Sequence, residues 1–282
     1  MINRIILAGG AILLVFLLFI FGKTENHIET PETPAPAISF SIQQYISIAK
    51  AKLPSRQSIT LSKLENNITR GDLKKQEGNQ YDALAEFWKD SVKLFAPYAY
   101  YLSESAKLDN SEKNLTFAAR LILENMRREE DQGIKAWESQ TAVALFQQAL
   151  KLNPENDDLK VGLGSCYVYG QGMAGDPQQT MKGIQQLLEV VRKDSNNMQA
   201  QMVLGIGAVV SGQNDRAIVR LKKVVDFDSD NLEAVSWLSD AYAATGDKAN
   251  AIKWYEHSKH LVNNPDFSKE VDQRIKALQS SP

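Results

Sequence analysis

The stretch 198–231, MQAQMVLGIGAVVSGQNDRAIVRLKKVVDFDSDN, is followed at once by 232–265, LEAVSWLSDAYAATGDKANAIKWYEHSKHLVNNP. The second stretch repeats the pattern of the first at a spacing of 34 residues. Identical residues at this spacing include Leu204 and Leu238, Gly212 and Gly246, and Ala217 and Ala251. Equivalent places at the same spacing are held by Gly205 and Ser239, Ala208 and Tyr242, and Leu221 and Tyr255. Agreement in several registers at one period indicates an internal repeat.

Each copy reads as two helices joined by a short turn. Leu204, Gly205 and Ala208 fall on one helical stripe, and a small residue in that stripe lets a second helix approach closely. Gly212 and Gly246 follow as turn residues that can adopt positive φ. Such a hairpin leaves apolar surface uncovered, and the next hairpin covers it, so the pattern predicts a stack of hairpins.

This 34-residue pattern resembles the tetratricopeptide repeat family. The resemblance implies an all-α fold, a right-handed α-solenoid of helix hairpins. A third repeat over 157–197 has Leu163, Gly164 and Tyr167 in the family's Leu-Gly-x-x-Tyr places, but its second helix arrives seven residues late. The excess predicts an inserted, glycine-rich loop from Gly170 to Pro177 that exposes Met173. Together with 198–231 and 232–265, this gives three repeats over 157–265.

Weaker repeats and a cap are expected on either side of this region. Over 58–156 we expect degenerate helical repeats, with Gly78 as the turn of the first and Phe87 in its second helix. Ala142 and Phe146 match the family's second-helix places, but the sequence leaves open which preceding helix pairs with them. Residues 266–282 predict a capping helix and tail, whose apolar stripe covers the last repeat.

The N-terminal 57 residues predict three further segments. Residues 5–22 contain no charge and just span a hydrocarbon core of roughly 30 Å, so 1–23 predicts an uncleaved membrane anchor, with a cleaved secretory signal as the alternative. Arg4 before the run and the acidic residues after it place the N-terminus in the cytoplasm and the soluble part outside, periplasmic in a bacterium. Residues 24–37 form a proline-rich linker, and 38–57 a short helix that docks on the first repeat or lies on the membrane surface.

Composition argues against several kinds of chemistry. A formal net charge of −2 gives no general attraction to nucleic acid. The single Cys166 excludes an internal disulfide and a cysteine-rich metal site. His257 and His260, with Glu256 four residues before His260, have metal-ligand spacing, but a solvated helix surface explains them better. No nucleotide-binding or nucleophile motif is present, so we expect no cofactor, no metal and no enzymatic activity.

What remains is a surface for a partner. In the resembled family the inner face is lined by first-helix residues outside the packing stripe, and such a face implies a protein or peptide partner. The corresponding positions here are Val161, Ser165, Val168, Met202, Ile206, Val209, Val210, Ser236, Trp237 and Asp240. None of them is lysine or asparagine, which the family's chaperone-binding members use to grip a terminal carboxylate. The sequence therefore predicts an apolar groove with Trp237 as an anchor and Asp240 as an acceptor, the alternative being that Met202, Ile206 and Val209 pack against a neighbouring repeat.

Two functional hypotheses follow. The first is a membrane-tethered repeat scaffold that binds protein partners outside the cytoplasm; its layout is similar to repeat proteins of bacterial cytochrome c maturation. The second is a structural spacer in an envelope-assembly, secretion or cytochrome c biogenesis complex, which would use an edge or the loop around Met173.

Overall fold

The structure is a computed structural model that describes residues 40–68, 74–172 and 177–280. The chain divides into two units, Met1–Ile38 and Ser39–Pro282, and every described residue belongs to the second. All regular structure in these three described ranges is helical, which confirms the expected all-α class. The predicted anchor (1–23) and linker (24–37) lie outside the described residues. No helix among the described residues has both the length and the apolar character needed to cross a membrane.

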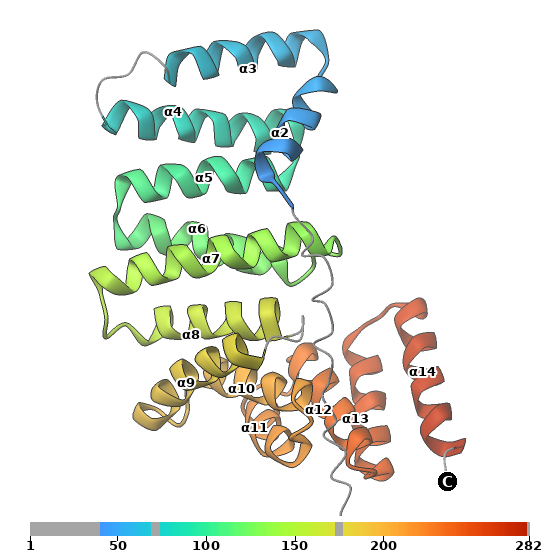
Figure 1. Ribbon diagram of the computed structural model, residues 1–282. Coiled ribbons are helices and arrows are strands. Elements are labelled where there is room, and N and C mark those ends of the chain that lie inside the picture. The colour runs from blue at the N-terminus through green and yellow to red at the C-terminus, as the bar shows by residue number, and fades with distance from the viewer. Residues whose placement is uncertain (1–39, 69–73, 173–176, 281–282) are drawn as a thin grey trace, which may run out of the picture. The chain divides into compact units, whose positions relative to one another are not determined.

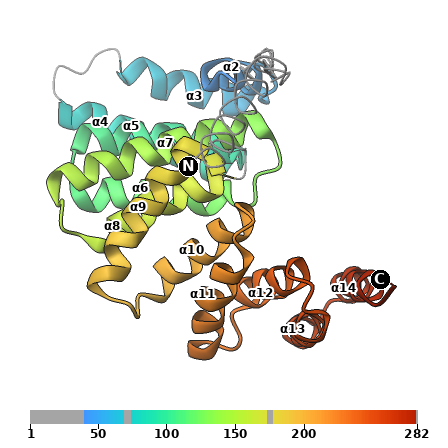
Figure 2. The ribbon, with the colours of Figure 1, turned by 60° about the horizontal axis from the view of Figure 1, so that its bottom comes forward.

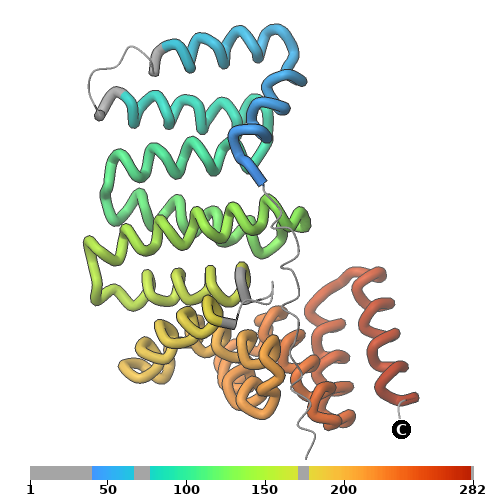
Figure 3. Tube along the Cα trace, viewed as in Figure 1, coloured from blue at the N-terminus to red at the C-terminus, as the bar shows by residue number. Residues whose placement is uncertain are grey.

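The helices form a stack in chain order. Each helix from α3 to α14 packs against the next one in the sequence (Figure 1), and the tube trace in Figure 3 follows the chain through this succession. The elements are α2 (Ile42–Ala51), α3 (Ser55–Ile68), α4 (Lys74–Glu86), η1 (Phe87–Val92), α5 (Phe95–Asp109), α6 (Glu112–Met126), α7 (Gln132–Leu152), α8 (Asp157–Ser165), η2 (Cys166–Gly172), α9 (Pro177–Lys193), α10 (Met198–Val210), α11 (Asn214–Phe227), α12 (Leu232–Ala244), α13 (Lys248–Leu261) and α14 (Pro265–Ser280). The two π-helical segments, η1 and η2, continue α4 and α8.

Five hairpins make up the described part of the stack. The most extensive contacts join α4 to α5, α6 to α7, α10 to α11 and α12 to α13, while α9 packs on α8 and η2. The partner of α7, left open by the sequence, is therefore α6. Ala119 and Ile122 of α6 are fully buried in the places of the motif glycine and tyrosine. Ala142 follows Ala119 by 23 residues, whereas the equivalent residues Gly205 and Ala217 are 12 residues apart. The 11 extra residues hide this repeat in the sequence.

The first hairpin differs from the prediction. Gly78 lies inside α4 and is not a turn, and α4 is the first helix of its hairpin. The buried residues Leu84, Ala85 and Trp88 occupy the Leu-Gly-x-x-Tyr places, so the assignment of Phe87 to a second helix was wrong. The error arose because Trp88 replaces the motif tyrosine and no glycine marks the motif.

The predicted inserted loop is also shorter than expected. The chain stays helical through η2 to Gly172, and α9 begins at Pro177, so only residues 173–176 separate the two. Gly170 is part of η2, where a Cβ would lie 2.1 Å from Ser139 Oγ, so glycine is needed for close packing and not for a turn. Met173 lies outside the described residues.

The glycine roles predicted in the repeats are confirmed. A Cβ on Gly205 would lie 2.7 Å from Leu221 Cγ, so α10 and α11 approach more closely there than any larger residue permits. Gly212 and Gly246 have φ of +74° and +81°, the left-handed conformation that favours glycine after a helix. The repeat pattern therefore reports close packing and turn geometry directly.

Both ends of the stack are covered by additional helices. At the N-terminal end, α3 packs against α4 (Figure 1), and α2 packs against α5, where Ile42 and Ile46 are buried. At the other end, Val271 and Ile275 of α14 are buried in one cluster with Tyr255 of α13, as the sequence predicts for a capping helix. Figure 2 shows α14 alongside α13 at the C-terminal end.

Candidate functional site

The first helices of four successive hairpins line one hollowed region. Residues of α6, α8 with η2, α10 and α12 surround two adjoining hollows of about 590 and 340 Å³, and Lys135 of α7 lines the larger one. Both hollows are lined by Glu124, Arg127 and Tyr169, so we treat them together as the inner cleft. The other lining residues are Arg120, Leu123, Arg128, Lys135, Asp158, Gly162, Ser165, Gln199, Met202, Val203, Leu232, Glu233 and Trp237.

Helix ends position the charged residues of the inner cleft. Arg127 is the C-cap residue of α6, and Glu233 lies in the first turn of α12. The side chain of Asn231 caps α12 by accepting a hydrogen bond from the Ala234 amide at 3.0 Å. A carboxylate in the first turn of a helix is further stabilised by the helix dipole. Helix capping therefore holds Glu233 where it faces the end of α6.

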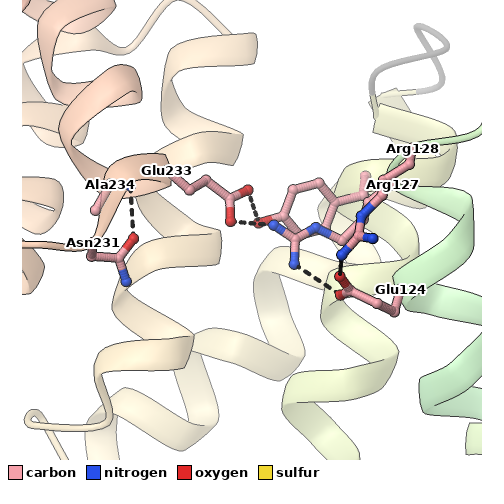
Figure 4. A network of polar contacts seen from close by, with 7 residues as sticks. Glu124, Arg127, Arg128, Asn231, Glu233 and Ala234 are labelled. Carbon is pink, nitrogen blue, oxygen red and sulfur yellow. Dashed lines mark hydrogen bonds and ion pairs between the residues drawn. The ribbon is translucent and has the colours of Figure 1, made fainter. Parts of the chain in front are cut away.

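A polar network crosses the inner cleft (Figure 4). Arg127 donates hydrogen bonds to Glu233 and, at 3.4 Å, to Glu124. Its guanidinium carbon lies 4.6 Å from the centre of the Tyr169 ring, a cation–π contact. Tyr169 Oη in turn donates to Glu233 Oε1 at 3.0 Å. The network thus joins α6, η2 and α12, three elements from different hairpins.

Protonation in this network is held fixed near neutral pH. Burial lowers the pKa of Arg127, but the adjacent Tyr169 and Glu233 outweigh it, and the net pKa is raised above its ordinary value. Burial, followed by the charge of Glu233, raises the pKa of Tyr169. Arg127 therefore stays charged and Tyr169 stays a donor across the physiological range.

Four of the predicted partner-binding residues are buried. Val161, Ser165, Val168 and Ile206 are each at most 3% exposed. The prediction of an open groove was wrong for Val161, Val168 and Ile206, whereas Ser165 borders the inner cleft from a buried position. The hairpins approach one another so closely that these side chains fill the space between them. For Ile206 this is the alternative considered from the sequence, packing against a neighbouring repeat. Ser165 uses its hydroxyl internally, donating to the Val161 carbonyl at 2.8 Å.

The remaining predicted residues keep some exposure. Met202, Val209, Ser236, Trp237 and Asp240 are half-buried, and Val210 is exposed. Met202 and Trp237 line the inner cleft. Asp240 is not a free acceptor, because it accepts from Tyr255 Oη and, at 3.1 Å, from Arg274 Nη1.

The inner cleft is charged, in contrast to the apolar groove predicted from the sequence. Sequence reasoning missed Arg127, Tyr169 and Glu233, which are its central polar residues. One signal was present: Glu233 lies four residues before Trp237 in the same helix, so the rule that selects Trp237 for the inner face also selects Glu233. Arg127 has no such signal, because only the tertiary structure brings α6 to α12.

The candidate metal residues lie apart from this cleft. His257 Nε2 is 2.8 Å from the Ser229 carbonyl, and its ring packs edge-on against Trp254. Glu256 pairs with Lys259 at 3.1 Å. In the part of the chain that the structure describes, no group of three or more His, Cys, Asp or Glu side chains is placed to hold a metal ion.

Comparison with known proteins supports the repeat assignment. Residues 202–261 match the family model of the tetratricopeptide repeat. The chain is similar in structure to TTC0263, a thermophilic repeat protein of this kind from Thermus thermophilus, with 15% identity, a TM-score of 0.50, and coverage of 72% of this chain and 98% of that chain. At this identity the likeness concerns the fold alone.

Two other solved structures are similar at lower scores. YrrB, described as a repeat protein with an unusual peptide-binding site, is 16% identical over 74% of this chain and 97% of its own, with a TM-score of 0.45. PilW, a type IV pilus biogenesis factor, is 15% identical over 72% of this chain and 94% of its own, with a TM-score of 0.48. No curated protein matches the chain in sequence.

Proposed function

We propose that this protein is a non-enzymatic scaffold that holds a protein partner in the inner cleft, because residues 202–261 match the tetratricopeptide repeat family and the described helices form a stack of hairpins. The observation that carries the proposal is that two half-buried apolar side chains, Met202 and Trp237, line the same cleft as the charged network. Tryptophan at the edge of a partly desolvated pocket is typical of residues that dominate binding energy. The charges of Arg128 and Lys135 on the same cleft supply orientation and specificity.

A spacer role is the second candidate. Val219 and Phe227 of α11 are 72% and 74% exposed and lie outside the inner cleft. Large apolar side chains exposed on one helix are typical of a contact surface. A spacer in an envelope-assembly, secretion or cytochrome c biogenesis complex would use this edge, and its partner would not depend on the inner cleft.

Capture of partners by variants of the full chain separates the two. Trp237→Ala removes the proposed anchor, and Met202→Glu places a charge in the cleft. Phe227→Ala is the matched control on the α11 edge. If the partner binds in the inner cleft, the first two variants should lose the proteins captured by crosslinking in intact cells, and Phe227→Ala should keep them. Loss of these proteins by Phe227→Ala alone supports the spacer role.

We also propose that residues 5–22 tether the repeats to a membrane, with the N-terminus in the cytoplasm and the repeats outside. The support is the uncharged run between Arg4 and Lys23 and the acidic residues that follow it. Protease added outside intact cells after removal of any outer barrier should degrade the repeats. Degradation only after the inner membrane is lysed contradicts this orientation.

A further inference from the structure

A separate hollow lies outside the inner cleft, between α9, α10 and α11. It has a volume of about 450 Å³ and shares no lining residue with the inner cleft. Met181, Ile184 and Leu188 of α9 form one wall, and Gly207 and Ala208 of α10 form the floor. Arg216 and Arg220 of α11 form the opposite wall. We call this hollow the α9–α11 groove.

The repeat pattern explains why the α9–α11 groove is open. Ala208 stands where Tyr167 and Tyr242 stand in the repeats before and after it, and Arg220 stands 34 residues before Trp254. Tyr242 and Trp254 are half-buried and pack against the core of the stack. The α10–α11 hairpin thus has neither of the two aromatic rings that occupy the equivalent positions in the next hairpin. The two positions that lack the rings, Ala208 and Arg220, both line the groove.

Apolar side chains beside the groove are unusually exposed. Met181 is 56% exposed and Val210 is 39% exposed, and both line it. A ligand side chain seated over Ala208 would cover part of both. Methionine at such a position adapts to ligand side chains of different shape, because it is unbranched and polarizable.

Among the described residues, the arginines of the groove have no acidic partner. Arg216 Nη1 donates to Gln213 Oε1 at 2.6 Å, and Arg220 Nη1 donates to Gln201 Oε1 at 2.7 Å. Within the described ranges neither guanidinium pairs with a carboxylate, whereas Lys222 on the same helix pairs with Asp226 at 3.0 Å. Burial and then the charge of Arg216 lower the pKa of Arg220, as expected for two neighbouring cations without a counter-charge.

We propose that the α9–α11 groove binds a partner-protein segment in which an apolar side chain is followed closely by an aspartate or glutamate. The apolar side chain fills the space over Ala208, and the acidic side chain accepts hydrogen bonds from Arg216 and Arg220. Arginines four residues apart on a helix lie roughly 5–6 Å apart at Cβ. A partner chain that runs along α11 passes both arginines and continues beyond them. This arrangement favours recognition of a side-chain carboxylate over recognition of a C-terminal carboxylate. Arginine–carboxylate pairs of this kind are strong and directional.

The probe is a library of random peptides displayed with blocked C-termini, selected on the purified full chain. Selected sequences should combine an apolar residue with an Asp or Glu within one helical turn of it. Binding of the resulting synthetic, amidated peptides is then measured by fluorescence polarisation. Replacing their Asp or Glu by the amide should weaken binding at least tenfold.

Two variants locate the binding. Ala208→Tyr installs the residue of the neighbouring repeats, so it should fold normally and weaken the peptides at least tenfold. Arg220→Gln removes the charge but keeps a polar side chain, and it should weaken them at least fivefold. Trp237→Ala, in the inner cleft, should bind them as the wild type does, which separates this proposal from the proposed function. Selected peptides without acidic residues, peptides that need a free C-terminal carboxylate, or equal binding by folded Ala208→Tyr or by Arg220→Gln would each overturn it.

Discussion

Arg127 at the end of α6 forms an ion pair with Glu233 at the start of α12, 106 residues further along the chain. In a repeat stack most contacts join neighbouring hairpins only. This pair skips the α8–α9 and α10–α11 hairpins and is reinforced by Tyr169, which contacts both of its members. The network therefore couples hairpins that sequence periodicity treats as independent, and it does so in the candidate binding cleft.

The coupling of this pair is measurable. Both side chains are about 30% exposed, so solvent screens the interaction. A double-mutant cycle with Arg127→Ala and Glu233→Ala should give a coupling free energy of about 1 kcal/mol, which falls as salt is raised. Chemical unfolding of the two single variants, the double variant and the wild type provides the values. Additive single effects would contradict the network.

A buried acid makes stability depend on pH. Burial raises the pKa of Glu138 to about 8, although Asn125 opposes this by donating to Oε1 at 2.8 Å. The ordinary value is 4.5, so between these two pH values the folded chain holds a proton that the unfolded chain has lost. The free energy of unfolding should therefore fall as pH rises through this window, by up to about 1.4 kcal/mol per pH unit.

Glu138→Gln tests that dependence. The amide cannot ionise, so the variant should lose less stability between pH 5 and pH 8.5 than the wild type and should be the more stable protein at the upper end. Glu130→Gln, at an exposed position nearby, is the matched control and should follow the wild-type curve. Parallel curves for wild type and Glu138→Gln, measured by urea unfolding, would show that Glu138 does not titrate in this range.

Alanine substitutions at two helical glycines should have opposite effects. A Cβ on Gly164 would lie 2.6 Å from Leu187 Cγ and 3.1 Å from the Gly183 carbonyl oxygen, so Gly164→Ala should lower the free energy of unfolding by about 1–3 kcal/mol. A Cβ on Gly78 would meet nothing within 4 Å, so Gly78→Ala should raise it by about 0.5–1 kcal/mol through helix propensity. Equal shifts in the unfolding midpoint for both variants would contradict the close packing of α8 and α9.

The sequence predicts the regular part of this fold well, because its signal is periodic. Positions such as Gly205 and Gly212 are constrained by one neighbouring helix or one turn, and the period reports them. Where larger residues replace small ones, as Trp88 does, the signal fails, and the first hairpin was assigned in the wrong register. A further hairpin was hidden for a different reason, because the 11 extra residues between Ala119 and Ala142 break the period.

The candidate site was less predictable. Which residues face inward follows from helical periodicity, and this placed Met202 and Trp237 correctly in the inner cleft. Which of them stay accessible depends on how closely the hairpins approach, and so Val161 and Ile206 were wrongly expected on the surface. The charged character of the cleft comes from Arg127, whose position depends on tertiary structure alone.

Site-specific photo-crosslinking in intact cells tests directly whether a partner occupies the inner cleft. A photoreactive amino acid replaces Gln199, an exposed residue that lines the inner cleft, in one version of the full chain. It replaces Phe227, on the exposed edge of α11, in another. We expect one dominant adduct from position 199 that is absent or much weaker from position 227, and we expect Met202→Glu to abolish this adduct. A stronger adduct from position 227, or equal labelling of many proteins from both positions, would contradict binding in the inner cleft.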